Sequence, residues 1–258
     1  MTGPARRDWF DSVVTPALIG AALLLLWHLG VVYTGTNVFP RPFDVLAATG
    51  DLYTQGKLVP YILDSVGRVL AGYMLAILLG TPLGLLMGSR RDLATAVNPV
   101  IQILRPISPL AWLPVAVVLL GIGNAPAILL IFLASFFPIV VSSMNAVMNV
   151  REVHLRVGRN FGLSPREVLM RVLIPAATPQ LVIGFRITLG IAWLVVVAAE
   201  MLAVDSGLGY LVIDSRNAGK RYDLVVAAMV CIGLIGLLLD LVMRWLERTT
   251  AGRWSQTS

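Results

Sequence analysis

The chain has 258 residues, of which 57% are hydrophobic and 13% are charged, and it carries a net charge of +6. An average soluble domain is about 25% charged, so this composition leaves too little polar surface for a water-soluble globule. It excludes a soluble enzyme and indicates an integral membrane protein. The single cysteine, Cys231, lies in an apolar run, which excludes an internal disulfide and a cysteine-based metal site.

Apolar runs predict an all-α integral membrane protein with six transmembrane helices. A bilayer core about 30 Å thick is crossed by about 20 helical residues. The third run is short unless it begins nearer Val97 and includes Arg105 and Pro106. The first is too long for a secretory signal and lacks the cleavage pattern, so we interpret it as an uncleaved span. The six runs are residues 16–35, 62–88, 108–122, 126–148, 180–204 and 224–245.

The distribution of lysine and arginine predicts that both termini lie in the cytoplasm. With the N-terminus inside, twelve of these residues fall on the inner side and five on the outer side, and short cytoplasmic loops are biased toward positive charge. We therefore expect a tail at 1–15, a single transmembrane domain at 16–248 and a tail at 249–258. The polar insert at 149–178, which holds five arginines, is then cytoplasmic.

The polar insert is predicted to form two helices around a glycine turn. Asn149 is expected to begin the first helix, with Glu152 three positions later completing a capping box, and Gly162 to end it. Ser164 and Glu167 repeat the capping box at the start of the second helix. The insert therefore reads as helix, turn, helix.

The second helix of the insert is amphipathic. Pro165 suits its first position, and Pro175 is expected to end it. Two capped helices around a short turn also imitate a DNA-binding helix-turn-helix. Apolar spans begin within a few residues on both sides, which leaves no room for a major-groove contact, so we expect no nucleic acid partner. The apolar stripe, which can rest on the membrane domain, consists of Val168, Leu169, Val172 and Leu173.

The insert resembles the cytoplasmic loop of permeases of bacterial ATP-driven importers. That loop has the pattern Glu-Ala-Ala, three residues, Gly, nine residues and Ile-x-Leu-Pro. Aligned on Gly162, nine residues lead to Val-Leu-Ile-Pro at 172–175, so the glycine, the spacing and the ending agree. The opening departs from the pattern, because Arg-Val-Gly occupies the Glu-Ala-Ala positions at 156–158. An ATPase contact there must use reversed charge, or backbone and apolar groups.

The resemblance continues along the chain and points to the nitrate, taurine, aliphatic sulfonate and bicarbonate branch of these permeases. It implies the type I ABC importer fold with six spans in the bacterial inner membrane. It also implies a second copy of the chain, two ABC ATPase subunits and an extracytoplasmic solute-binding protein as partners, beside membrane lipid. The segments that carry it are VFPRPFDVL (38–46), LRPISPLAWLP (104–114), AWLVVVAAEM (192–201), GLGYL (207–211) and GLIGLLLDLVMRWLE (233–247).

The resemblance makes the insert a coupling loop that contacts the ATPase. The chain has no G-x-x-x-x-G-K-[ST] phosphate loop, since neither Gly56-Lys57-Leu58 nor Gly219-Lys220-Arg221 fits. We therefore expect a transport subunit that is not itself an enzyme and binds no cofactor or metal, with ATP and Mg²⁺ held by the partner ATPase. The proposed contact residues are Arg156, Val157, Gly158, Arg159, Phe161, Gly162, Leu163, Ser164 and Pro175.

Polar side chains within the spans are candidates for a translocation pathway, because such groups are costly in a membrane. Glu200 is either a pathway residue or a carboxylate fixed by a nearby arginine or hydroxyl; the family's solutes are mostly anions, which favours the second. Arg105 either assists an anion in an irregular, cavity-lining segment or extends to the headgroups. The pathway candidates are Arg105, Ser108, Trp112, Ser142, Asn145 and Glu200.

Other polar and small residues predict helix packing. Arg68 and Arg186 are expected to extend to headgroups or to pair, and Asp240 to pair with Arg244 one turn later. For Ser142, Ser143 and Asn145 we favour hydrogen bonds between helices. A glycine repeat favours close packing within the chain over a dimer seam; it consists of Gly80, Gly84 and Gly88. The prolines expected to bend or interrupt helices are Pro82, Pro106, Pro109, Pro114 and Pro138.

The predicted function is the permease subunit of an ATP-driven importer, acting as a homodimer. Its expected solute is a small oxyanion: nitrate, a sulfonate such as taurine, or bicarbonate. One alternative is the same machinery acting on an uncharged heterocyclic solute. The other is a self-sufficient secondary transporter, which would be expected to show an inverted repeat or a mid-membrane ion site; the sequence has no visible repeat of this kind.

Overall fold

The structure is a computed structural model that describes residues 14–35, 39–150, 152–153, 156, 160–217 and 219–252. In this part of the chain the regular structure is helical and includes no strand. Five helices are long and apolar enough to cross a membrane, and a sixth span results if a bent helix pair is counted as one. The prediction of an all-α membrane protein with six spans is confirmed.

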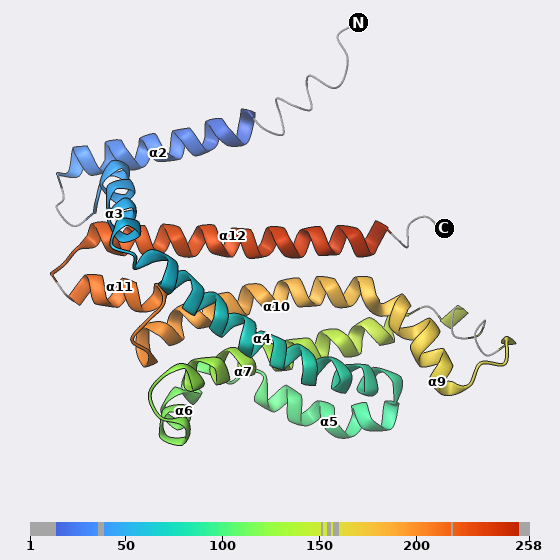
Figure 1. Cartoon of the computed structure of the whole chain (residues 1–258). Coiled ribbons are helices and arrows are strands. Elements are labelled where there is room, and N and C mark those ends of the chain that lie inside the picture. Colours follow the sequence, from blue (N-terminus) through green and yellow to red (C-terminus); the bar gives the residue numbers. More distant parts are fainter. Residues whose placement is uncertain are drawn as a thin grey trace, which may run out of the picture. The chain divides into compact units, whose positions relative to one another are not determined.

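Two compact units make up the chain, Met1–Val59 with Leu211–Val230 and Pro60–Tyr210 with Cys231–Ser258. The first unit contains α2 (Thr15–Thr34), α3 (Pro42–Thr54), most of α11 (Leu208–Asn217) and the start of α12 (Tyr222–Gly252). The second contains most of α4 (Leu58–Ser89), then α5 (Arg91–Leu104), α6 (Leu113–Leu120), α7 (Asn124–Met148), α9 (Pro165–Val168), α10 (Ile174–Ala203) and the remainder of α12 (Figure 1).

In the first unit, α2 and α3 are joined by aromatic and backbone contacts. The indole Nε1 of Trp27 donates to the Pro40 carbonyl oxygen at 3.1 Å, and its ring meets Phe39 edge-on at 5.9 Å between centroids. Helix α3 begins with a carboxylate cap, in which Asp44 accepts the backbone N–H of Arg41 at 3.0 Å. The contacts of Trp27 hold α2 against the residues that lead into α3.

In the second unit, α4 packs on α7 along the glycine repeat. A Cβ on Gly88 would stand 2.6 Å from the Val147 Cβ, and one on Gly80 would stand 3.1 Å from the Ile139 Cγ2. Gly84, between them, is buried against the α7 backbone in the same way. The repeat therefore serves close packing inside the chain, as predicted, and small residues of this kind allow helix backbones to approach.

Helix α7 packs along α10, and α10 packs along the second half of α12 (Figure 1). Trp193 of α10 donates its indole N–H to the Ile232 carbonyl oxygen at 3.1 Å, and the same ring covers Gly236. Cys231 is buried, as expected for a small core residue. Because α4 has 32 residues, it is about 48 Å long and exceeds a bilayer core of about 30 Å.

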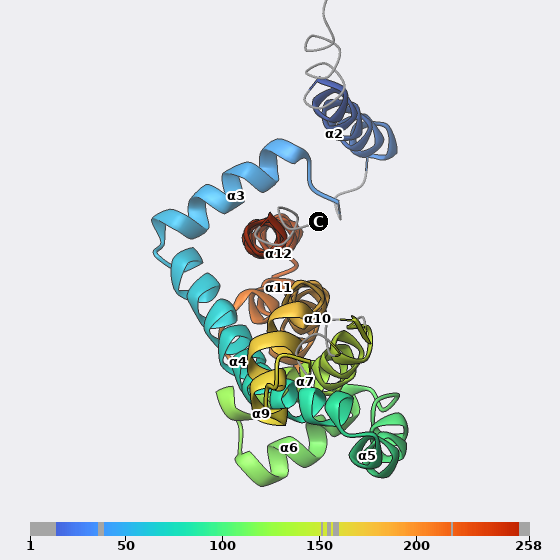
Figure 2. The same ribbon diagram turned by 90° about the vertical axis from the view of Figure 1, so that its right-hand side faces the viewer.

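The third predicted span, 108–122, is too short to be a span by itself, because the helical segment there extends only from Pro109 to Leu120 and counts as a span only together with α5. The chain forms α5 and then breaks before the 3₁₀ helix η2 (Pro109–Trp112) and α6, with an angle of 81° between the two halves. Pro106 and Pro109 lie in or beside this break, where each lacks the N–H that would continue an α-helix. Ile101 of α5 is buried in a cluster with residues of α4 and α7, and Figure 2 shows α5 next to the end of α4.

Proline interrupts the helices less often than expected. Helices α4 and α7 run continuously through Pro82 and Pro138, and Pro114 sits in the first turn of α6, where its missing N–H is not needed. The predicted interruption is therefore confined to Pro106 and Pro109. Packing from neighbouring helices keeps the other segments helical, as membrane proteins allow.

Two boundaries of the insert differ from prediction. Asn149 ends α7 instead of beginning a new helix, because its N–H donates to the Asn145 carbonyl oxygen at 3.0 Å. Pro175 does not end the second helix; it lies in the first turn of α10. A π-helical turn, η3 (Leu169–Leu173), precedes it. This wider turn comes just before the proline that lacks a backbone donor, and helix continues from α9 into α10.

Candidate functional site

A buried ion pair connects α4 with α10. The Arg68 Nη1 donates to the Glu200 Oε1 at 2.6 Å, and the side chains are 4% and 0% exposed. The other carboxylate oxygen accepts the Ser65 hydroxyl at 2.8 Å and the backbone N–H of Gly209 at 2.9 Å. Glu200 is thus a carboxylate fixed by an arginine and a hydroxyl, the arrangement that the charge argument favoured.

The rest of the Arg68 guanidinium is also satisfied. Its Nε donates to the Asn124 Oδ1 at 2.8 Å, and Nη1 donates to the Ser206 carbonyl oxygen at 2.8 Å. Nη2 donates to the Ser206 hydroxyl. Together with Ser65, which bonds to Glu200, these residues come from α4, the start of α7, α10 and the turn before α11, so the hydrogen bonds connect four segments. We call this group, Ser65, Arg68, Asn124, Glu200 and Ser206, the buried network.

The turn after α10 is shaped to reach Glu200. Gly207 has φ +103, and a Cβ there would stand 2.5 Å from the Glu200 carboxylate carbon. Only glycine combines this left-handed backbone with so close an approach. The next N–H, that of Leu208, donates to the Ser65 hydroxyl at 2.9 Å. The start of the GLGYL segment is therefore held against the carboxylate by its own backbone.

Sequence reasoning did not identify Ser65, Asn124 or Ser206. These residues are separated from Glu200 or Arg68 by up to 138 positions, and no local spacing links them. A usable signal did exist, because these three polar residues all lie near the ends of apolar runs on the predicted outer side of the membrane. Their shared side could have suggested that they contact one another and the charged pair.

A second charged group joins α10 to the later part of α12. Arg186 donates to Asp240 at 2.6 Å and to Glu247 at 3.0 Å. Asp240 also accepts Arg244 at 2.8 Å, one turn away on α12, as predicted. Arg186 therefore forms ion pairs, which is one of the two outcomes expected from the sequence. Glu247, which sequence reasoning did not single out, completes a set of two cations and two anions.

The break between α5 and α6 holds three of the pathway candidates. Arg105 is the C-cap of α5, and Ser108 is the N-cap of η2, whose last residue is Trp112. Arg105 and Ser108 are exposed, and the Trp112 side chain is 38% exposed. No ion pair of Arg105 occurs within the described ranges. The three lie together at this irregular segment.

Ser142 and Asn145 lie apart from that break, toward the end of α7. Ser142 faces α10, where its hydroxyl lies against Gly184, and Asn145 is exposed. Among the described residues, the buried hydroxyl of their neighbour Ser143 has no hydrogen-bond partner, so the hydrogen bond expected of it is not formed. A side chain at position 184 would collide with Ser142, so glycine is needed where Ser142 meets α10.

The turn of the insert and its second helix belong to the described residues 160–217. Gly162 has φ +72, as predicted for the turn. The Ser164 backbone N–H and hydroxyl both donate to the Glu167 carboxylate, at 3.0 and 2.8 Å, and the Glu167 N–H donates back to the Ser164 hydroxyl at 3.4 Å. This confirms the second capping box. Phe161 and Leu163 flank the turn, and the Phe161 ring is 82% exposed.

The stripe of the second insert helix contacts the membrane helices, as predicted. Leu173 is buried in a cluster with Ala146, Val147 and Leu181, and Leu169 packs on it. In the first insert helix, Arg156 pairs with Glu152 at 3.0 Å, both strongly exposed, so the pair contributes little stability. Val157, Gly158 and Arg159 lie outside the described residues.

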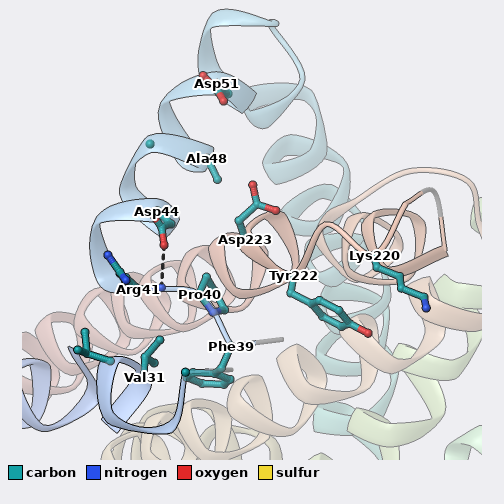
Figure 3. A pocket seen from close by; sticks show the side chains of 13 residues that line it. Val31, Phe39, Pro40, Arg41, Asp44, Ala48, Asp51, Lys220, Tyr222 and Asp223 are labelled. Carbon is teal, nitrogen blue, oxygen red and sulfur yellow. Dashed lines mark hydrogen bonds between the residues drawn. The ribbon is translucent and has the colours of Figure 1, made fainter. Parts of the chain in front are cut away.

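The first unit contains a cavity of about 630 Å³ beside α2, α3 and the start of α12 (Figure 3). Asp44, Asp51 and Asp223 line it together with Arg41 and Lys220. Arg221, which is not a lining residue, donates hydrogen bonds to Asp223, and these hydrogen bonds raise the pKa of Arg221. Among the described residues, no cluster of three or more His, Cys, Asp or Glu side chains is arranged to hold a metal ion.

The chain matches a protein family over most of its length. The family model described as "Binding-protein-dependent transport system inner membrane component" matches residues 80–252. A putative ABC transporter permease of Methanocaldococcus jannaschii is 36% identical over 248 residues, covering 92% of this chain and 90% of that protein. The range matched by the family model includes Glu200 and the whole insert at 149–178, and it begins after Ser65 and Arg68.

Two further relatives carry names that refer to a solute. A nitrate import permease of Synechocystis is 35% identical over 253 residues, covering 95% of this chain and 91% of that protein. A taurine transport permease of Escherichia coli is 36% identical over 253 residues, with 95% and 90% covered. Among solved structures, an inward-facing MetNI methionine ABC transporter matches with a TM-score of 0.67 at 20% identity, covering 75% of this chain and 95% of that chain.

Proposed function

This chain belongs to the family of binding-protein-dependent transport system inner membrane components, and we propose that the solute it moves is a small oxyanion: nitrate, a sulfonate such as taurine, or bicarbonate. It is the permease component of an ABC importer in the inner membrane. The observation that carries the proposal is the similarity, over nearly the whole chain, to permeases named for nitrate and taurine import.

The proposed pathway begins at the break between α5 and α6. An exposed arginine without a carboxylate partner in the described structure is suited to an anion, and Arg105 is such a residue. Ser108 and Trp112 beside it supply a hydroxyl and an aromatic face. Glu200 is the weakest of the pathway candidates, because a fully buried carboxylate that already accepts three hydrogen bonds has little capacity left for a solute.

Neutral polar groups near the end of α7 extend the proposed route. Asn145 is exposed and offers both donors and an acceptor to a passing oxyanion. Ser142 lies at the contact with α10, where a helix shift would uncover or cover its hydroxyl. We propose these two as secondary contacts and Arg105 as the principal one.

The coupling loop is proposed to receive the ATPase. Its turn presents an exposed aromatic ring, Phe161, next to Gly162 and Leu163, and exposed aromatic side chains are typical anchors of protein interfaces. The Ser164 cap and the Leu173 contact connect this turn to the membrane helices. Arg156 to Arg159 and Pro175 complete the proposed contact set, with Arg156 replacing the family's acidic group.

We further propose that two copies of the chain form the pathway, with both termini in the cytoplasm. An even number of spans, six if the bent pair counts as one, places the two termini on the same side, and the lysine and arginine count selects the inner one. ATP and Mg²⁺ are proposed to bind the partner ATPase, and a solute-binding protein is proposed to deliver the oxyanion from outside.

Reconstitution into liposomes tests the proposal. The chain is purified with the ATPase and the solute-binding protein encoded beside it, and uptake of labelled nitrate, taurine and bicarbonate is followed with and without ATP. ATP-dependent uptake of one oxyanion is expected. Uptake without the ATPase would establish the secondary transporter, and uptake of a heterocycle but of none of the oxyanions would refute the solute assignment.

A further inference from the structure

A second cavity, of about 940 Å³, opens where several helices of the second unit end together. It lies between the end of α4 at Ser89, the end of α7 at Met148, and the α9–η3 segment of the coupling loop. Its walls come from the membrane helices on one side and from the loop on the other. The cavity therefore sits at the level where apolar spans give way to the polar insert.

The charged residues that line this cavity in the described part of the chain are both positive. They are Arg90 and Arg166, and no acidic residue is among the described lining residues. None of the ion pairs in the described chain includes either arginine. The neighbouring carboxylate, Glu167, is already bonded to Ser164 and to Arg171 at 3.5 Å. Two unpaired guanidinium groups at one cavity attract an anion, and guanidinium is well matched to phosphate.

Apart from Ser89, the remaining described lining is apolar. Leu86 of α4, Met148 of α7 and Leu163 and Leu169 of the loop all face the cavity. A site built for a small soluble anion would surround it with donors, whereas this one offers two cations beside a mainly aliphatic wall. An amphiphile with an anionic head and hydrocarbon chains satisfies both parts at once. Basic pockets between membrane helices on the cytoplasmic side bind anionic headgroups in this manner.

We propose that this cavity binds one anionic phospholipid, with its phosphate between Arg90 and Arg166 and its acyl chains along Leu86 and Leu169. The location in the cytoplasmic leaflet rests on the proposed function, which sets the orientation of the chain. The lipid touches the end of α4, the end of α7 and the second insert helix. It therefore fills the space beneath the coupling loop and supports the position of that loop on the membrane helices.

Lipid binding to the isolated permease tests the site. The purified chain is exchanged into nanodiscs of phosphatidylcholine with or without phosphatidylglycerol, and retained lipid is counted by native mass spectrometry. The test variant is R90Q/R166Q; the matched control, R91Q/R248Q, removes the same charge from two other exposed arginines of the predicted cytoplasmic side. At about 1 kcal/mol per arginine, the test variant should bind phosphatidylglycerol about 30-fold more weakly, and the control less than about twofold.

Three results would overturn the proposal. Equal loss in the two variants would mean a diffuse charge effect, and displacement of the lipid by millimolar inorganic phosphate would mean a free-anion site. Displacement of the lipid by added ATPase, with crosslinks from Leu163→Cys to that subunit, would mean a protein docking cavity. The thermal melting of both variants in phosphatidylcholine alone should match the parent chain. The comparison of R90Q/R166Q with R91Q/R248Q in nanodiscs contains neither solute nor ATPase, so failed oxyanion uptake would leave the lipid site standing.

Discussion

Arg68 and Arg105 are both charged residues within predicted membrane segments, but they occupy opposite environments. Arg68 is buried between α4, α7 and α10, and each of its nitrogens donates a hydrogen bond. Arg105 stands at the end of α5, where the helix breaks and the side chain is exposed. The same residue type is thus part of the packed interior at Arg68, and its guanidinium is accessible to a ligand at Arg105.

This difference teaches how to separate structural from functional charge in a membrane protein. Removing one partner of a buried ion pair leaves the other charge buried without a partner, whereas removing an exposed charge leaves no unpaired charge in the interior. The two regions should therefore respond in opposite ways: the buried network through stability, and the break through transport. Substitutions in the two regions should separate these effects.

Substitution of Glu200 by Gln should have the largest effect. It leaves Arg68 buried with a neutral partner, and breaking a buried pair in this way costs about 3–5 kcal/mol. Unfolding of the detergent-solubilised chain, followed by circular dichroism, measures the loss. The double variant R68M/E200M should recover part of it, because no charge stays buried. Stability equal to that of the parent chain would contradict the structural role of the network.

Substitutions of two glycines on α4 should act with opposite sign. Gly84→Ala places a methyl group against the α7 backbone, and overpacking costs about 1–3 kcal/mol. Gly67→Ala, on the same helix, meets no atom within 4 Å and should be neutral or stabilising by up to about 1 kcal/mol. The comparison uses the same unfolding measurement. Equal effects at the two sites would mean that α4 and α7 do not approach closely there.

Substitution of Ser164 by Ala should loosen the start of the second insert helix. The loss of an N-cap costs about 1 kcal/mol, so hydrogen exchange at residues 165–173 should accelerate about fivefold, and uptake per ATP hydrolysed should fall. Thr95→Ala is the control, because this exposed hydroxyl donates to the Arg91 carbonyl oxygen of its own helix, α5, and does not line the proposed lipid cavity in the described structure. Unchanged exchange and unchanged coupling in Ser164→Ala would refute the proposed role of the cap.

Substitution of Arg105 by Gln should change stability by less than about 0.5 kcal/mol, as expected for an exposed site. Its effect should appear in transport, as at least a tenfold fall in ATP-driven oxyanion uptake. Arg248→Gln, which neutralises an exposed arginine near the end of α12, should leave uptake unchanged. A large loss of stability in Arg105→Gln, or uptake equal to that of the parent chain, would remove Arg105 from the proposed pathway.

Local patterns predicted local structure well. The Ser164–Glu167 cap, the turn at Gly162 and the Asp240–Arg244 pair were all predictable, because their partners lie within four positions of each other or depend on one backbone angle. Asn149 was misjudged because asparagine suits either end of a helix, and the apolar run before it decided the outcome. Pro175 was misjudged because proline is compatible with a first turn as well as with an ending.

Patterns of charge and hydrophobicity could not supply the long-range partners. The apolar surroundings of Glu200 in the sequence predicted that an arginine or a hydroxyl would bind its carboxylate, but not which residue. Arg68, 132 positions away, became its partner because α4 and α10 pack together in the second unit. The break near Pro106 was likewise visible as an irregular segment, but the 81° bend depends on how α6 packs against α7.

The sequence by itself determined that the chain is a helical membrane protein and roughly where its spans lie, because these follow from composition and from the length of the apolar runs. The resemblance of its loop and turn to those of the importer family rested on matching motifs. The tertiary structure alone decided which charges neutralise each other and which remain available. That decision depends on the distance between helices that are remote in sequence: burial makes an unpaired charge costly, and only packing reveals whether a partner is within reach.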